Sequence, residues 1–233
     1  MSESVTPAVP VHIGFIMDGN RRWAREHGLP AYEGHKFGYE KFVEVVEECF
    51  ARGVQYVTFY AFSTENWKRD DQEVSYLMQV LVMAINKQLK RSIKNGIRVR
   101  FLGRRDMVEP KVRKAIEKAE AATQGLTKGT LCICLDYGGK QEIADAAKKC
   151  VEDGLSAGEI TPEAIAARLY QPDVPPIDLL VRTSGEQRIS NFMLWRIEYS
   201  ELLFLEKHWP EMTKDDVTDI IEVYDQRSRR FGG

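Results

Sequence analysis

Short apolar runs alternate along the chain with longer segments in which apolar positions recur at helical spacing. The runs cover residues 11–17, 55–62, 97–102, 130–135, 178–181 and 201–204. The helical spacing appears in residues 36–52, 72–95, 110–123, 140–153, 163–170 and 213–227. Runs of β-branched and apolar residues predict buried strands, and the 3.6-residue period predicts helices that pack against them.

This alternation predicts an α/β fold, a single domain whose central, mostly parallel β-sheet is flanked by helices. Residues 23–27 are predicted as a helical turn and residues 192–197 as a further short helix. No internal repeat or linker divides the chain. We expect residues 1–10 to form a disordered tail, so that the predicted domain covers residues 11–233.

Polar loops follow three of the predicted strands, at residues 18–22, 63–69 and 182–191. The carboxyl ends of parallel strands lie at one edge of a sheet, and ligands of open α/β proteins bind there. The pattern therefore predicts a ligand site at this edge. The alternative at this point is that each loop only turns the chain.

The loops contain arginines, hydroxyl groups and carboxylates. Arginine forks and hydroxyl donors suit phosphate oxygens, and carboxylates in such a site are explained if Mg²⁺ lies between them and the ligand. Trp23 and Trp67 beside these charges indicate a ligand with one anionic and one apolar end. A nucleotide is the competing interpretation, but the sequence contains neither GxxxxGK[ST] nor GxGxxG.

Charge and cysteine content narrow the possible partners. The chain has 33 Lys and Arg against 35 Asp and Glu, a net charge of −2, which offers no overall attraction for nucleic acid. Its four cysteines form no CxxC pair and indicate free thiols in a reducing compartment. No signal peptide and no apolar run of about 20 residues is present, so we expect a cytoplasmic protein.

Several motifs together resemble those of one enzyme family. They are HIGFIMDGNRRWA (12–24), GHKFG (34–38), YAFSTENWKR (60–69), DYGG (136–139), LVRTSGEQRISNFMLW (180–195), YSELLF (199–204) and WP (209–210). In this order they resemble the cis-prenyltransferases, the undecaprenyl diphosphate synthase family, over residues 12–233. The resemblance implies a Mg²⁺-dependent enzyme that condenses isopentenyl diphosphate with an allylic diphosphate, such as geranyl or farnesyl diphosphate, to give a Z-configured polyprenyl diphosphate. It also implies an apolar tunnel, with residues 72–95 as one wall.

The resemblance further implies roles for individual residues. Asp18 is the expected catalytic carboxylate and contacts Mg²⁺ together with Glu201, while Asn66 is the expected proton acceptor. The expected contacts of the allylic diphosphate are Gly19, Asn20, Arg21, Arg22 and Trp23, with His35 beside the phosphates. The second loop supplies Ser63, Thr64, Glu65, Trp67 and Arg69, and the isopentenyl diphosphate site has Arg182, Arg188, Ile189 and Ser190.

Departures from the family pattern bear on the product. Ala31 stands where an arginine is frequent, Asp136 replaces an asparagine, and Leu135 is bulkier than the residue often found there. Because Leu135 could shorten the tunnel and no extra segment lies between residues 87 and 98, we expect a short- to medium-chain product. Two other classes of protein are alternatives to a catalytic prenyltransferase. One is an accessory subunit that binds a catalytic partner, and the other is a phosphatase or nucleotide-binding α/β protein.

The resemblance also predicts assembly and surroundings. We expect a homodimer, whose interface could include the apolar residues Phe192, Leu194, Trp195, Phe204 and Trp209, although these could equally be core. The C-terminal residues 229–233 are expected to order near the diphosphate site. Because the expected product is apolar, we expect the protein to contact a membrane surface reversibly.

Overall fold

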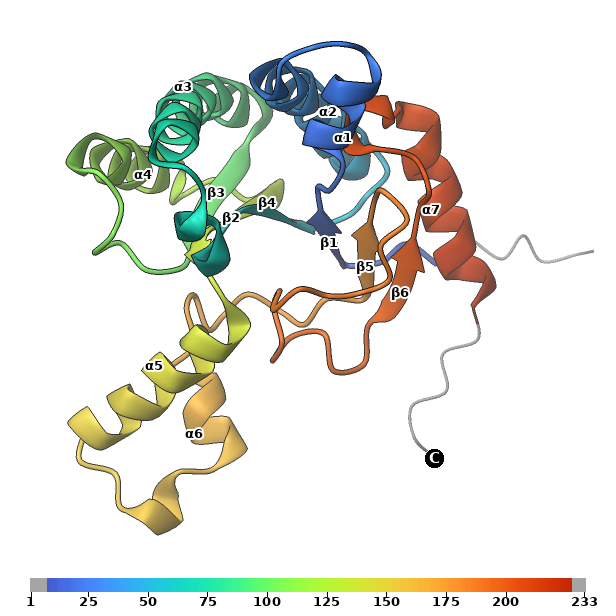
Figure 1. Ribbon diagram of the computed structural model, residues 1–233. Helices are drawn as coiled ribbons and strands as arrows, with labels where there is room; N and C mark the ends of the chain where they lie inside the picture. Colours follow the sequence, from blue (N-terminus) through green and yellow to red (C-terminus); the bar gives the residue numbers. More distant parts are fainter. Residues whose placement is uncertain (1–7, 228–233) are drawn as a thin grey trace, which may run out of the picture. The chain divides into compact units, whose positions relative to one another are not determined.

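Six strands form a parallel sheet in the computed structural model, which describes residues 8–227 (Figure 1). Their order in the sheet is β3-β4-β2-β1-β5-β6. The strands are β1 (His12–Ile16), β2 (Tyr56–Ser63), β3 (Ile97–Leu102), β4 (Gly129–Tyr137), β5 (Leu179–Arg182) and β6 (Glu201–Phe204). The predicted parallel α/β sheet is confirmed.

The described chain falls into two compact units, each of which we describe by itself. The first contains residues 8–57, 177–188 and 199–227, and the second contains residues 58–176 and 189–198. Of the predicted disordered tail, residues 1–10, the first seven lie outside the described residues, as does the predicted ordering of residues 229–233. Residues 8–10 are described and Pro10 is buried, so the prediction of disorder is wrong for them. Ala8, within the described part, donates its backbone N–H to the Asp225 carboxylate at 2.6 Å.

In the first unit, β5 pairs with β1 on one side and β6 on the other. Ile13 lies opposite Leu179, which lies opposite Glu201, and Ile16 lies opposite Arg182, which lies opposite Phe204. Every residue of β1 and β5 is buried, as expected for parallel strands covered on both faces. The helices of this unit are α1 (Asn20–Glu26), α2 (Ala31–Ala51), the 3₁₀ turn η3 (Trp209–Glu211) and α7 (Lys214–Gln226).

In the second unit, β3 pairs with β4 in parallel register from Ile97–Gly129 to Leu102–Cys134. Helices α3 (Asp71–Asn95) and α4 (Pro110–Thr123) lie side by side and pack against β3 (Figure 1). Helices α5 (Gly139–Glu152) and α6 (Pro162–Ala166) pair around a small apolar core that includes Ala146, Cys150 and Leu169. Two 3₁₀ turns, η1 (Thr64–Lys68) and η2 (Ala157–Glu159), complete the unit.

The stripe predicted on α3 is buried unevenly. Met78, Ile85 and Leu89 are buried, whereas Val74 and Leu81 in the first half of the helix are half-buried. Apolar side chains that stay half-buried would suit the wall of a hollow, and the tunnel itself remains a prediction. In the described part of the chain, no helix is long and apolar enough to cross a bilayer.

Several predictions of local structure need correction. The helix predicted from residue 36 begins at Ala31, and the turn predicted over residues 23–27 is a helix that begins at Asn20. The helix predicted over residues 163–170 ends at Ala166. Residues 192–197 form turns and bends instead of a helix. Ser190, Asn191 and Met193 have φ angles of 47°, 63° and 47°, in the left-handed region, so a right-handed helix cannot continue through them.

The GHKFG motif is explained by close packing of α1 on α2. A Cβ atom at Gly34 would lie 2.0 Å from the backbone oxygen of Asn20, and one at Gly38 would lie 2.1 Å from the Asn20 Oδ1 atom. Neither position has room for a side chain. The two glycines therefore set the distance between α2 and the helix that follows Asp18.

We expect Gly34→Ala to lower the free energy of unfolding by about 1–3 kcal/mol, because the added methyl group forces two helix backbones apart. Urea unfolding followed by circular dichroism measures this change. Gly125→Ala is the matched control, since a Cβ there meets nothing within 4 Å. Equal stability of the two variants would contradict this account of the motif.

Candidate active site

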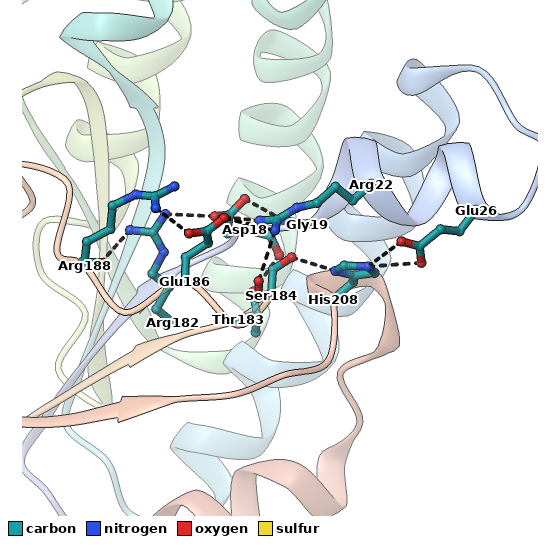
Figure 2. A network of polar contacts seen from close by, with 10 residues as sticks. All are labelled: Asp18, Gly19, Arg22, Glu26, Arg182, Thr183, Ser184, Glu186, Arg188 and His208. Carbon is teal, nitrogen blue, oxygen red and sulfur yellow. Dashed lines mark hydrogen bonds and ion pairs between the residues drawn. The ribbon is translucent and has the colours of Figure 1, made fainter.

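A cluster of charged side chains surrounds Asp18, two residues beyond the end of β1 (Figure 2). The Asp18 carboxylate accepts from the backbone N–H of Gly19 at 2.8 Å, from Arg182 Nη2 at 2.8 Å and from Arg22 Nη2 at 3.1 Å. Arg182 comes from the end of β5, the neighbour of β1, and Arg22 from the first turn of α1. Parallel pairing of β1 with β5 thus brings together residues 164 positions apart.

Electrostatics keep Asp18 ionised. Burial by itself would raise the pKa of the Asp18 carboxyl, but hydrogen bonds from Arg182 and Arg22, together with their positive charges, outweigh it and lower the pKa below the usual 3.8. The side chain of Asp18 is still 29% exposed, whereas that of Arg182 is 5% exposed. Asp18 therefore carries a negative charge at neutral pH and remains accessible.

Glu186 connects the remaining cations. Its carboxylate accepts from Arg22 Nη1 at 3.2 Å and from Arg188, and Arg182 in turn donates to the backbone oxygen of Arg188 (Figure 2). Three guanidinium groups and two carboxylates leave the cluster with an excess of one positive charge. Such a surface favours an anion with several oxygens, because each guanidinium offers several donors in a fixed plane.

The Asp18–Gly19 turn is fixed by backbone as well as side-chain contacts. Gly19 has φ +103° and is the N-cap of α1. The backbone oxygen of Asp18 accepts from the Thr183 hydroxyl at 2.7 Å and from the Trp209 N–H at 3.0 Å. A left-handed residue is needed to turn the chain from strand to helix here, and glycine adopts it without strain.

The other predicted residues of this unit lie on α1 and α2. Asn20 donates to the backbone oxygen of Met17 at 3.2 Å, and Trp23 packs against His27 and Phe37, with ring centroids 4.3 and 4.9 Å away. Arg21 is exposed in the first turn of α1. His35 lies half-buried on α2, next to Gly34.

Glu201 lies at the opposite end of the sheet from Asp18 in the same chain. It is level with Ile13, five residues before Asp18, and its carboxylate accepts from Arg227 Nη1 at 2.8 Å. At about 3.3 Å per strand residue, the two carboxylates are separated by more than about 10 Å along the strands, whereas ligands of one Mg²⁺ lie about 2.1 Å from it. The predicted pairing of Asp18 and Glu201 on one ion within a single chain therefore needs correction.

In the second unit, the loop of residues 63–69 forms its own network. The Asn66 side-chain oxygen accepts from the Ser63 N–H at 3.0 Å, Asn191 donates to Glu65 at 3.0 Å, and Arg69 pairs with Glu73 at 2.9 Å. Burial would raise the pKa of Glu65, but backbone and Asn191 hydrogen bonds outweigh it and lower the pKa. Thr64 donates to the same carboxylate at 3.2 Å.

Asp136, which replaces the asparagine frequent in the family, holds this loop through Trp67. It is fully buried with φ +47°, and its carboxylate accepts from the Trp67 indole N–H at 2.7 Å and from Arg104 at 3.3 Å. Trp67 also packs edge-on against Phe62, with ring centroids 4.9 Å apart. The buried Asp136 carboxylate is thus paired with Arg104.

The segment of residues 189–198 is attached to the start of α5. Asn191 accepts from the Gly139 N–H through its backbone oxygen at 2.7 Å and from the Lys140 N–H through its side chain at 2.9 Å. Ile189 accepts from the Phe192 N–H at 3.0 Å, and Ser190 has φ +47°. Asn191 connects this segment both to α5 and to Glu65, a role that the sequence analysis did not predict.

Sequence reasoning also missed residues of the first unit. Glu26, Thr183, Ser184, Glu186 and His208 all take part in the network around Asp18 (Figure 2). One signal was available, since the three arginines of the site require carboxylates and Glu186 lies between two of them in sequence. Nothing in the sequence pattern pointed to Glu26 and His208, which lie 182 positions apart.

The chain is similar to known proteins over nearly all of its length. Residues 16–232 match a family model described as "Putative undecaprenyl diphosphate synthase". An isoprenyl transferase of Thermotoga maritima is 44% identical over 97% of this chain and 97% of its own. A trans,polycis-polyprenyl diphosphate synthase of Thermobifida fusca, specific for (2Z,6E)-farnesyl diphosphate, is 44% identical over 97% of this chain and 81% of its own.

Solved structures agree with these relatives. Lavandulyl diphosphate synthase from Lavandula x intermedia, in complex with dimethylallyl diphosphate, superimposes with a TM-score of 0.93 at 30% identity, covering 97% of this chain and 99% of its own. A probable undecaprenyl diphosphate synthase from Campylobacter jejuni gives a TM-score of 0.83 at 29% identity, covering 98% and 100%.

Proposed function

Because the chain belongs to the undecaprenyl diphosphate synthase family and is an isoprenyl transferase, we propose that it condenses isopentenyl diphosphate with an allylic diphosphate to give a Z-configured polyprenyl diphosphate. The observation that carries this proposal is the cluster around Asp18. Three guanidinium groups and two carboxylates, of which that of Asp18 is ionised, meet at the carboxyl ends of two neighbouring strands and leave an excess of one positive charge. A diphosphate is the kind of ligand that such a cluster attracts.

The chemistry needs charge control at the reacting carbon. The C1–O bond of the allylic diphosphate breaks, and the diphosphate leaves with the electron pair. The isopentenyl double bond then forms a new bond to C1, and a proton leaves its C2. Arg22 would stabilise the charge that gathers on the departing allylic diphosphate, because fixed donors aimed at developing charge lower the barrier.

The residues around Asp18 fit Mg²⁺ bound together with a diphosphate. Mg²⁺ usually takes one or two carboxylates and completes its shell with substrate phosphates and water. Among residues 8–227, no cluster of three His, Cys, Asp or Glu side chains could hold a metal alone. Asp18 would hold the ion, which when bound supplies Lewis-acid stabilisation to the leaving group.

We assign the other predicted residues to the two substrates. Gly19, Asn20, Arg21, Arg22, Trp23 and His35 would bind the allylic diphosphate, and Arg182, Arg188, Ile189 and Ser190 the isopentenyl diphosphate. In the second loop, Ser63, Thr64, Glu65, Trp67 and Arg69 would contact substrate. Asn66 is assigned as the proton acceptor, although its side-chain oxygen already accepts from the Ser63 N–H.

The proposal is tested with the purified chain, Mg²⁺, labelled isopentenyl diphosphate and each of dimethylallyl, geranyl and farnesyl diphosphate. Butanol-extractable label is the expected product, and its loss with EDTA is expected if Mg²⁺ is required. An inactive chain that becomes active only with a second subunit would identify an accessory protein instead. Release of inorganic phosphate without transfer would identify a phosphatase.

We expect a short- to medium-chain product, because α3 contains no extra segment and Leu135 is fully buried at the end of β4. Each added isoprene unit buries about five carbons at about 0.8 kcal/mol per CH₂, so the length of the cavity limits the number of units held. Reversed-phase chromatography of the dephosphorylated product measures the length. Dolichol-length material would contradict this expectation.

We also propose a homodimer that touches a membrane reversibly while working in the cytoplasm. Phe192 and Trp209 are fully buried within the chain and so belong to its core, but Leu202 on the edge strand β6 and Tyr199 before it are 38% and 67% exposed. Exposed apolar groups on an edge strand favour pairing. Light scattering checks the dimer, and flotation of the enzyme with vesicles that contain its product checks the membrane contact.

A further inference from the structure

Three side chains beside the Asp18 turn form a hydrogen-bonded chain, which we call the Ser184 relay (Figure 2). Glu26 lies on α1, His208 immediately before η3, and Ser184 in the loop after β5. The Ser184 hydroxyl lies 2.6 Å from His208 Nδ1, and His208 Nε2 lies 3.1 Å from the Glu26 carboxylate. A carboxylate on Nε2 favours the ring proton there, which leaves Nδ1 to accept from the Ser184 hydroxyl.

The relay is built directly against the Gly19 turn. A Cβ atom on Gly19 would lie 2.7 Å from both His208 Nδ1 and Ser184 Oγ. The residues next to the relay, Thr183 and Trp209, both donate to the backbone oxygen of Asp18. The Gly19 turn therefore packs against both Ser184 and His208, and the hydrogen bond between these two residues holds them together on either side of it.

Two further observations indicate a functional constraint. Ser184 has φ +81°, a left-handed conformation that costs about 1–3 kcal/mol for a residue other than glycine and persists where the surroundings demand it. Its backbone oxygen accepts from Arg22 Nη1 at 3.1 Å. The orientation of the Ser184 peptide group therefore bears on where Arg22 points.

We propose that His208 and Ser184 are positioning residues that hold the turn of residues 18–22 and Arg22 in the geometry that binds the allylic diphosphate. Glu26 acts only by keeping the ring proton of His208 on Nε2, so that Nδ1 accepts from Ser184. This inference rests on the proposed function, in which that turn takes the allylic substrate. The relay acts through Gly19 and Arg22 and does not touch the reacting atoms.

The same connectivity occurs in enzymes with a nucleophilic serine, but the surroundings of Ser184 oppose that role. Ser184 is buried, 5% exposed, beneath Gly19 and His208. The backbone N–H groups that could stabilise an oxyanion are in use, since Ser184 donates to the Lys207 oxygen at 2.8 Å and Gly185 to the Leu205 oxygen at 2.9 Å. Without free donors the serine lacks what acyl transfer requires.

Two variants at position 208 separate the two halves of the relay. In His208→Asn, the amide oxygen takes the place of Nδ1 and still accepts from Ser184. In His208→Gln, the amide reaches the place of Nε2 and keeps the contact with Glu26 instead. We expect His208→Gln to raise the KM for the allylic diphosphate about tenfold, while His208→Asn stays near the parent enzyme and the KM for isopentenyl diphosphate changes in neither.

Ser184→Gly removes the hydroxyl and relieves the left-handed strain. If the Ser184 side chain had no positioning role, this variant would be more stable than the parent and would bind the allylic diphosphate with the same affinity. We expect unchanged or raised thermal stability together with the same tenfold rise in the allylic KM. An equal KM for the His208→Gln and His208→Asn enzymes, or a rise for both substrates alike, overturns the proposal.

A binding measurement keeps this test independent of turnover. Calorimetry with inorganic diphosphate and Mg²⁺ is expected to show affinity about tenfold weaker in Ser184→Gly and His208→Gln than in His208→Asn or the parent chain. A parent enzyme that binds diphosphate but transfers no prenyl group would refute the proposed function alone. Equal affinities in all four proteins, or labelling of Ser184 by a fluorophosphonate, would refute the relay.

Discussion

Asp18→Ala is expected to lower kcat for prenyl transfer by at least about a thousandfold while the circular dichroism spectrum stays that of the parent chain. Asp18 is ionised, accessible and bonded to two arginines, and it would hold Mg²⁺ against the departing diphosphate. Loss of several kcal/mol of charge stabilisation in the transition state gives a factor of this size. Incorporation of labelled isopentenyl diphosphate measures it.

Two further variants make the result specific. Asp18→Asn keeps an acceptor for Arg182 but loses the charge, so we expect a comparable loss of activity with less effect on stability. Asp215→Ala removes an exposed carboxylate from the first turn of α7 and is the matched control. A kcat within about tenfold of the parent for Asp18→Ala would show that this carboxylate is not catalytic.

Binding of inorganic diphosphate distinguishes two effects of the negative charge of Asp18, which are repulsion of the anion and attraction of Mg²⁺. Without a divalent ion, the negative charge of Asp18 opposes an anionic ligand, so Asp18→Asn is expected to bind diphosphate more tightly than the parent chain. With Mg²⁺ present the order is expected to reverse, because the variant loses a metal ligand. Calorimetry with and without Mg²⁺ measures both affinities, and an unchanged order in the presence of Mg²⁺ would argue against metal binding by Asp18.

Arg196→Ala is expected to destabilise the fold by about 3–5 kcal/mol, because it leaves a buried carboxylate without its partner. The side chains of Arg196 and Glu142 are 3% and 0% exposed, and Nη1 of Arg196 lies 2.8 Å from Glu142. Arg196 also donates to the backbone oxygens of Tyr170, at 2.7 Å, and Val174, at 3.3 Å. One guanidinium thus joins α5, the loop after α6 and the segment of residues 189–198.

Urea unfolding measures the effect, with Arg168→Ala as the matched control. Arg168 pairs with Asp153 at 2.7 Å, but their side chains are 21% and 55% exposed, so we expect a cost of at most about 1 kcal/mol. The double variant Arg196→Met with Glu142→Gln removes both charges and is expected to cost less than Arg196→Ala alone. Similar stabilities of Arg196→Ala and Arg168→Ala would contradict the importance of the buried pair.

Local pattern was sufficient for the strands and for most helices, because continuous apolar runs and a 3.6-residue apolar period are properties of nearby residues. The local pattern gave a wrong prediction at residues 192–197, where the apolar residues Phe192, Leu194 and Trp195 suggested a helix. The left-handed conformations of Ser190, Asn191 and Met193 are stabilised by tertiary contacts, among them the bond from the Gly139 N–H to Asn191. Such contacts come from distant parts of the chain and leave no periodic signal.

The sequence by itself determined the α/β fold, the family and the loops that contain the candidate site, because these depend on residue types in a fixed order. Only the tertiary structure decided which charges meet. It placed Arg182 on Asp18, joined Ser184 to Glu26 through His208, and put Glu201 at the far end of the strands. Strand register and helix packing fix these distances, and both arise from burial across the whole unit.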